Sequence, residues 1–124
     1  MNVVDSSGWL QYFAKGTNAS LFAPVIQATE SLVVPTICMH EVFKRILAQR
    51  NEETALQAVG VMSLGTIADL TQEIAISAAQ ISSTLGIAMA DSIILATART
   101  YNATLWTQDA DFAGVECVKY IPGE

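Results

Sequence analysis

Short apolar runs that alternate with longer helical patterns limit the fold of this chain more than any other feature. The runs have the length of strands: "NVVD" at residues 2–5, "SLVVP" at 31–35, "TIADL" at 66–70, "ATLWT" at 103–107 and "ECVKYI" at 116–121. A strand covered on both faces reads as a continuous apolar run, and parallel strands need long crossover connections, usually helices. The alternation therefore predicts an α/β fold, a three-layer α/β/α sandwich with a mainly parallel central sheet.

The segments between these runs carry helix signals. Asn18 and Thr36 stand where N-caps are expected, Pro24 disturbs the middle of one helix, and Gly86 closes another. We expect helices over residues 6–13, 17–29, 37–50, 52–63 and 72–84, and one that opens just after Gly86.

Hydrophobic periodicity also predicts parts of the core. Trp106 ends an interior strand pattern, so we expect it to be buried. The helix after Thr36 carries an apolar stripe that should face the sheet, made of Ile37, Val42, Ile46 and Leu47.

The composition fits one globular domain over residues 1–124. Hydrophobic residues make up 52% of the chain and charged residues 15%, which excludes a disordered protein. So apolar a chain favours an oligomer or a partner that covers part of its surface. No apolar run approaches the ~18 residues of a membrane span, and the start "MNVVDSSGW" lacks the pattern of a secretory signal. We therefore expect a soluble, cytoplasmic protein with no membrane contact.

Charge and metal-binding residue types disfavour two classes of function. Cys38 and Cys117 are far apart and His40 is the single histidine, so the common zinc frameworks are excluded. A net charge of −6 argues against a generic electrostatic nucleic-acid binder. It does not exclude a nuclease whose carboxylates bind divalent cations, because those cations reverse the local charge.

Acidic residues fall where the predicted sheet would bring them to one edge. Asp5 ends the first strand, and Asp109 and Asp111 follow the fourth. Glu41 lies on the helix after the second strand, and Asp91 lies in the first turn of its own helix. Sites in open α/β sheets form outside the carboxyl ends of the strands. Four distant segments should therefore bring carboxylates together, where like charges about 4 Å apart repel by roughly 4 kcal/mol unless a cation is bound.

The ligand types select the cation. Oxygen ligands without His or Cys favour Mg²⁺ or Mn²⁺, which keep several waters and bind phosphate oxygens in their remaining positions. A metal pair could activate a water, orient the phosphate and stabilise the leaving oxygen in an in-line displacement. The residues themselves therefore indicate phosphodiester hydrolysis that needs no protein nucleophile.

Four segments of the chain resemble the PIN-domain nucleases, and within them the VapC-like toxins of bacterial toxin–antitoxin pairs. The segments are "NVVDSSGWL", "HEVFKR", "ADSIILATA" and "TLWTQDADF", in the family's order and at its spacing. The similarity covers nearly the whole chain. It implies that Asp5, Glu41, Asp91 and Asp109 are the catalytic, metal-binding acids, with Asp111 as a candidate outer ligand.

The same resemblance implies roles for two hydroxyl groups and for partner molecules. Thr107 would hold a water or a phosphate oxygen ahead of the fourth acid, and Ser6 corresponds to the small polar residue after the first. The family implies endonucleolytic cleavage of RNA, commonly tRNA or ribosomal RNA, with Mg²⁺ or Mn²⁺. It also implies a homodimer and a small antitoxin protein that docks on the toxin and blocks its site.

Each acid taken alone also has an ordinary explanation. Asp5 could cap the first helix, and Asp91 could complement the dipole of its own helix. Glu41 and Arg45 have the spacing of a surface pair on a helix. None of these explanations accounts for the coincidence of all the acids at one edge of one sheet.

Other functions and residues stay open. A catalytically silent PIN-like binding module is one alternative. A phosphoacceptor receiver domain is another, disfavoured because Gln108 follows the fourth strand, where a receiver needs a Lys at the end of a late strand. Lys44, Arg45 and Arg50 are candidate RNA contacts, although a solvated helix face is the simpler explanation.

Overall fold

The computed structural model describes residues 1–123 and contains a five-stranded sheet in which every pair of neighbouring strands is parallel. Glu124, the last residue of the predicted single domain, lies outside the described residues. The strands are β1 (Asn2–Val4), β2 (Leu32–Pro35), β3 (Thr66–Ala68), β4 (Thr104–Thr107) and β5 (Val118–Tyr120). Their order is β3-β2-β1-β4-β5, which confirms the predicted α/β fold with a parallel sheet. A flavodoxin-like receiver sheet has the order 2-1-3-4-5, so the topology disagrees with the receiver alternative.

Six α-helices connect the strands, and the five whose bounds were predicted from the sequence begin and end within two residues of those bounds. Two short 3₁₀ helices, η1 (Thr29–Ser31) and η2 (Ala110–Phe112), precede β2 and follow β4. The α-helices are α1 (Ser6–Phe13), α2 (Ala19–Gln27), α3 (Thr36–Gln49), α4 (Glu52–Met62), α5 (Gln72–Leu85) and α6 (Met89–Thr100).

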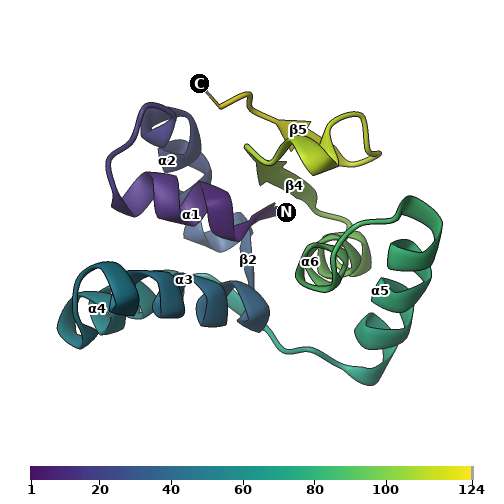
Figure 1. Cartoon of the computed structure of the whole chain (residues 1–124), viewed down its shortest axis with the longest axis horizontal. Coiled ribbons are helices and arrows are strands. Elements are labelled where there is room, and N and C mark those ends of the chain that lie inside the picture. Colours follow the sequence, from purple (N-terminus) through teal and green to yellow (C-terminus); the bar gives the residue numbers. More distant parts are fainter. Residues whose placement is uncertain (124) are drawn as a thin grey trace.

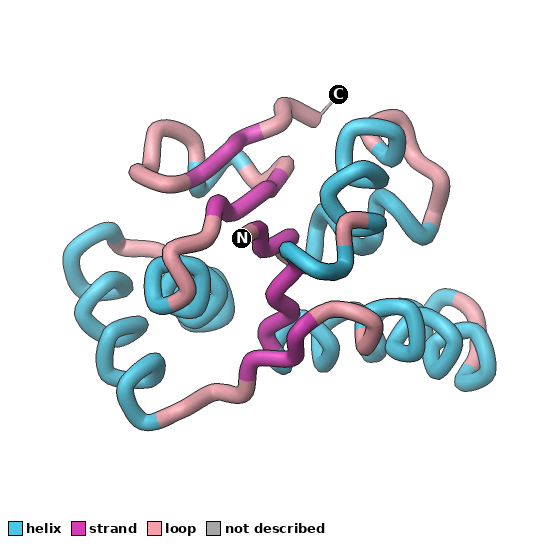
Figure 2. The backbone as a smooth tube through the Cα atoms, turned by 180° about the vertical axis from the view of Figure 1, so that it is seen from behind, coloured by secondary structure: helices cyan, strands magenta, loops and turns pink. Residues whose placement is uncertain are grey.

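The helices cover the sheet on both faces, as Figures 1 and 2 show. The connections from β1 to β2 and from β2 to β3 step in one direction across the sheet, and the connection from β3 to β4 steps back. Right-handed crossovers in opposite directions place their helices on opposite faces. Accordingly, α1 to α4 lie on one side of the strands and α5 and α6 on the other.

Among the described residues, no single helix is long and apolar enough to cross a membrane. Taken together, α5 and α6 have the length and apolar composition of a membrane span, but a bend of 117° separates them.

The core is centred on the sheet and on α6. Every residue of α6 from Ser92 to Ala98 is buried, including the apolar positions behind Asp91. Two predictions about the core differ from the structure. Leu47 is 44% exposed, so it does not belong to the inner stripe of α3. Trp106 is only partly buried: it packs against the core, and its Nε1 donates a hydrogen bond to Asn2 Oδ1 at 2.9 Å.

Two predicted N-caps also differ from the structure. The N-cap position of α3 is Pro35, which has no side-chain cap, so Thr36 is the first helical residue rather than the cap. Asn18 occupies the N-cap position of α2 but makes no capping bond with its side chain. Its Nδ2 instead donates to Gln108 Oε1 and to the carbonyl of Pro122, both at 3.1 Å. That contact ties the start of α2 to the loop after β4.

The strand order determines where a site can form. The chain leaves β1 toward β2 on one side, and β4 pairs with β1 on the other, so the strand order reverses between β1 and β4. Ligands of open α/β sheets bind outside the carboxyl ends of the strands at such a switch point. The register pairs Val4 with Trp106, so Asp5 and Thr107 follow side by side at this edge.

Candidate active site

Asp5 lies at the switch point and is 3% exposed. Its Oδ1 accepts hydrogen bonds from Ser7 Oγ (2.7 Å) and from the backbone N–H of Gly8 (3.1 Å), which makes Asp5 the N-cap of α1. Its Oδ2 accepts from Thr107 Oγ1 at 2.6 Å. A Cβ at Gly8 would lie 2.6 Å from a side-chain carbon of Val4, so a glycine is needed for α1 to start this close to β1. These three hydrogen bonds fix the Asp5 carboxylate at the end of β1.

Thr107 connects the ends of the two neighbouring strands. Its side chain is completely buried, and its hydroxyl donates to Asp5 while accepting from the backbone N–H of Asp109 at 2.9 Å. Asp109 Oδ1 in turn accepts from the backbone N–H of Asp111 at 2.9 Å, which opens η2. The single proton of the Thr107 hydroxyl is thus directed to Asp5. Contact of Thr107 with a water or a phosphate stays a prediction.

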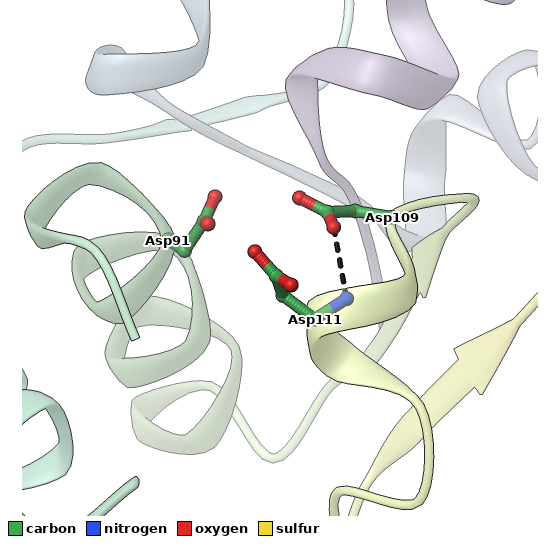
Figure 3. A group of neighbouring side chains, drawn as sticks. All are labelled: Asp91, Asp109 and Asp111. Atoms are coloured by element: carbon green, nitrogen blue, oxygen red, sulfur yellow. Dashed lines mark hydrogen bonds between the residues drawn. The ribbon is translucent and has the colours of Figure 1, made fainter. Parts of the chain in front are cut away.

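Asp91, Asp109 and Asp111 form the tightest group of carboxylates. One oxygen from each lies within 4.8 Å of the others. Figure 3 shows the three side chains pointing toward one another, Asp91 from the first turn of α6 and the other two from the segment after β4. Oxygens this close together on three side chains could share one cation. The role of Asp111 as an outer ligand stays a prediction.

Glu41 approaches from the opposite helical layer. It lies on α3, and its Oε1 accepts a hydrogen bond of 2.5 Å from Ser6 Oγ, at the first residue of α1. Ser6 thus holds the Glu41 side chain toward the start of α1. Arg45, the expected surface partner of Glu41 one helical turn away, lines the same cavity as Glu41.

Four of the five predicted acids line one cavity of about 610 Å³. Its wall includes Asp5, Glu41, Asp91 and Asp109, which come from four segments separated in sequence. Asp111 is not part of this wall, although it belongs to the three-carboxylate group with Asp91 and Asp109. The structure therefore brings all five predicted acids to one region, in two overlapping sets that share Asp91 and Asp109. Asp5 and Glu41 belong only to the cavity set.

The electrostatics of the site follow from this convergence. Partial burial, together with the charges of Asp109, Asp5, Glu41 and Asp111, raises the pKa of Asp91 from its ordinary 3.8 to about 6, and burial is the largest cause. Burial also raises the pKa of Asp5, and the hydrogen bonds that it accepts oppose that increase. A carboxyl group with a raised pKa is one whose charge the surroundings disfavour. Bound cations would remove that penalty.

The donor set fits a hard divalent cation. The described residues at the site offer carboxylate and hydroxyl oxygens, and no imidazole or thiol lines the cavity. Oxygen ligands of this kind suit Mg²⁺ and Mn²⁺. Cys38 is fully buried, and its thiol donates to the Val4 carbonyl at a sulfur–oxygen distance of 3.8 Å, so it belongs to the core rather than to the cavity.

Sequence reasoning missed several side chains that complete the site. The Ser7 hydroxyl donates a hydrogen bond to Asp5, and Gln108 and Leu10 line the cavity. Arg45 and Arg50 also line it, although a solvated helix face was the simpler expectation. The position of Arg45 one helical turn after Glu41 was the only sequence signal for its place, because i and i+4 share a helix face.

Comparisons with known proteins identify the family and the fold of this chain. The family model of the PIN domain matches residues 3–116. No curated protein matches the sequence. Among solved structures, a toxin–antitoxin complex from Klebsiella pneumoniae is similar, with a TM-score of 0.84, 22% identity and coverage of 100% of this chain and 99% of that chain.

Two further solved structures are similar over almost their whole length. FitAcB from Neisseria gonorrhoeae has a TM-score of 0.77 and 21% identity, with 98% of each chain covered. VapC20 from Mycobacterium tuberculosis, described as a toxin that cleaves the sarcin–ricin loop, has a TM-score of 0.77 and 12% identity, with 94% of this chain and 95% of that chain covered. At these identities the likeness concerns the fold.

Proposed function

Because the chain belongs to the PIN-domain family, as the match over residues 3–116 shows, we propose that it is a divalent-metal-dependent endoribonuclease. The observation that carries this proposal is the convergence of carboxylates from four chain segments on one cavity at the switch point of the sheet. Capping or surface pairing would explain each acid singly. A shared site explains why burial and mutual repulsion are tolerated together.

The proposed chemistry assigns separate tasks to the side chains. Asp91 and Asp109 belong to both sets of acids, so we assign them the central metal ligands, with Asp5, Glu41 and Asp111 around them. Thr107 and Ser6 fix the orientations of Asp5 and Glu41 through hydrogen bonds. When bound, Mg²⁺ or Mn²⁺ would activate a water for attack on the RNA phosphodiester and neutralise the charge that develops.

The biological role we propose is that of the toxin in a toxin–antitoxin pair of the VapC type, acting in the cytoplasm. Its RNA target would belong to the tRNA or ribosomal RNA class, its inhibitor would be a small antitoxin protein, and the toxin would form a homodimer. The similar folds of a structure described as a toxin–antitoxin complex and of two described as DNA-bound VapBC2 and VapBC support this role. Exposed apolar side chains such as Leu56, Leu64 and Ile76 offer surface that a second protein could cover.

The test is expression of the chain with and without the neighbouring open reading frame, scored by growth arrest and by RNA fragments together. We expect arrest and discrete fragments only when the chain is expressed alone. The purified protein should cleave RNA with Mg²⁺ or Mn²⁺ and lose this activity in EDTA. D91N should be inactive, whereas D69N, which removes an exposed acid outside the cavity, should remain active. A wild-type protein that cleaves no RNA with either metal would leave the silent binding module as the better explanation.

A further inference from the structure

The cavity is not uniformly acidic. Its wall contains Arg45 and Arg50 in addition to the four carboxylates, and both arginines come from α3 or its end. The chain has six Lys and Arg residues in all, against twelve Asp and Glu. Two of its few cationic groups are therefore placed in the cavity that holds the acids.

Along α3, the acidic and basic residues that line the cavity follow one another in order. Glu41, Arg45 and Gln49 are spaced by four residues, so they form one stripe on the same face of the helix. With a rise of 1.5 Å per residue, Arg45 lies about 6 Å and Gln49 about 12 Å beyond Glu41 along the helix axis. Arg50 occupies the C-cap position at the end of this stripe. The cavity thus runs from an acidic end toward a basic end.

Apolar side chains also line the cavity. Leu10 and Phe13 of α1, Ala14 directly after it, and Ile46 of α3 contribute to the wall. Within residues 1–123, neither the Arg45 nor the Arg50 side chain is tied to another side chain by a hydrogen bond, and both residues are exposed. The two guanidinium groups are therefore available to a ligand that enters the cavity.

We propose that Arg45 and Arg50 bind backbone phosphates of the nucleic-acid strand next to the phosphate held at the acidic end. This inference rests on the proposed nuclease function and specifies how that site holds its substrate. A protein with a net charge of −6 repels a polyanion, and cations at the acidic end can compensate only one part of the strand. Guanidinium groups match phosphate geometry with two parallel hydrogen bonds, and the apolar side chains of the wall suit the faces of bases.

Binding can test this proposal without any cleavage. The probe is a short fluorescein-labelled single-stranded RNA, titrated by fluorescence anisotropy with Ca²⁺ in place of Mg²⁺ to slow hydrolysis. We expect R45A and R50A each to weaken binding by about threefold to tenfold, and each lost phosphate contact to reduce the slope of log K against log salt by about 0.7. R45K should restore the salt slope, because lysine keeps the charge.

The matched control is K44A, which removes a neighbouring exposed cation of α3 that does not line the cavity. K44A should leave the affinity and the salt slope close to those of the wild type. A single-stranded DNA of the same sequence should lose affinity in R45A and R50A by the same factors, because both strands carry the same phosphates. A loss confined to RNA would indicate 2′-hydroxyl contacts and overturn the phosphate assignment.

The outcomes separate this inference from the nuclease proposal. If the double variant R45A/R50A binds RNA as tightly as K44A while the wild type cleaves RNA, the inference is wrong and the nuclease proposal stands. If the wild type never cleaves RNA but its binding depends on both arginines, the nuclease proposal is wrong and the phosphate contacts stand. Circular dichroism of each variant should match the wild type, since both side chains are exposed.

Discussion

Replacing Asp91 with Asn should stabilise the metal-free protein while abolishing its response to Mg²⁺. Asp91 is a partly buried carboxyl group whose charge is disfavoured by burial and by four neighbouring carboxylates. Asn keeps nearly the same shape and removes the charge. A residue that serves only the fold would give the opposite result, because most substitutions at partly buried positions destabilise.

The size of the effect follows from the pKa of Asp91. A rise from 3.8 to about 6 corresponds to roughly 3 kcal/mol of unfavourable free energy at neutral pH. Asp91 is partly open to solvent, and screening reduces this to about half. The charge also interacts favourably with the N-terminus of α6, by about 0.3 to 1 kcal/mol. We therefore expect D91N to raise the free energy of unfolding by about 1 kcal/mol at pH 7.

The pH dependence distinguishes this mechanism from a change in packing. The pKa of Asp91 is higher in the folded protein than in the unfolded chain, so between pH 3.8 and about 6 the folded state binds more protons. Stability contributed by this group therefore falls as the pH rises through that window. D91N cannot titrate, so its advantage over the wild type should vanish near pH 3.8 and reach its full value above about pH 6.

The assay is urea unfolding of the wild type, D91N and the control D69N at pH 4, 5, 6 and 7, with and without Mg²⁺. D69N removes an exposed acid outside the site and should show no such pH-dependent gain. Mg²⁺ at 100 times its Kd should stabilise the wild type by about 2.7 kcal/mol and D91N far less. The reasoning fails if D91N is less stable than the wild type at every pH, or if Mg²⁺ stabilises both proteins equally.

Three further predictions concern the hydrogen bonds and the metal. T107V should cost about 1 to 3 kcal/mol in urea unfolding, because it leaves Asp5 Oδ2 and the Asp109 N–H without their buried partner, and T107S should recover most of that loss. S6A removes the hydroxyl that holds Glu41 and should weaken Mg²⁺ binding about tenfold in calorimetry without changing the circular dichroism spectrum. Metal removal with EDTA should lower the midpoint of thermal unfolding of the wild type. A midpoint that changes neither with EDTA nor with added Mg²⁺ would contradict a metal site.

The strands and helices could be predicted from the sequence because most local signals agree with the final fold. β2 is a continuous apolar run because both faces of this inner strand are covered, whereas the edge strand β3 leaves Thr66 and Ile67 exposed. The left-handed conformation of Gly86, with φ at 70°, ends α5 as expected. The convergence of the acids followed from the same pattern, since parallel strands end at a common edge.

The errors have local causes that a pattern cannot reveal. Leu47 has the spacing of an inner residue of α3, but it lies on the side of the helix that turns to solvent near its end. Thr36 has the chemistry of an N-cap, but β2 runs directly into α3, so Pro35 already occupies that position. Hydrogen-bond partners such as Ser6 with Glu41 depend on the packing of α1 against α3, which no spacing in the sequence specifies.

Asp5 shows why an ordinary and a catalytic explanation of one side chain need not compete. A carboxylate offers about four acceptor positions, and Ser7, Gly8 and Thr107 use three of those on Asp5. The helix cap therefore fixes the carboxylate in place and leaves one position for a cation. It follows that a loss of activity in an Asp5 variant could come from an unfolded helix start as easily as from a lost ligand. Asp91 caps no helix, because the N-cap position of α6 lies three residues earlier and makes no side-chain cap, so its substitution separates the two explanations.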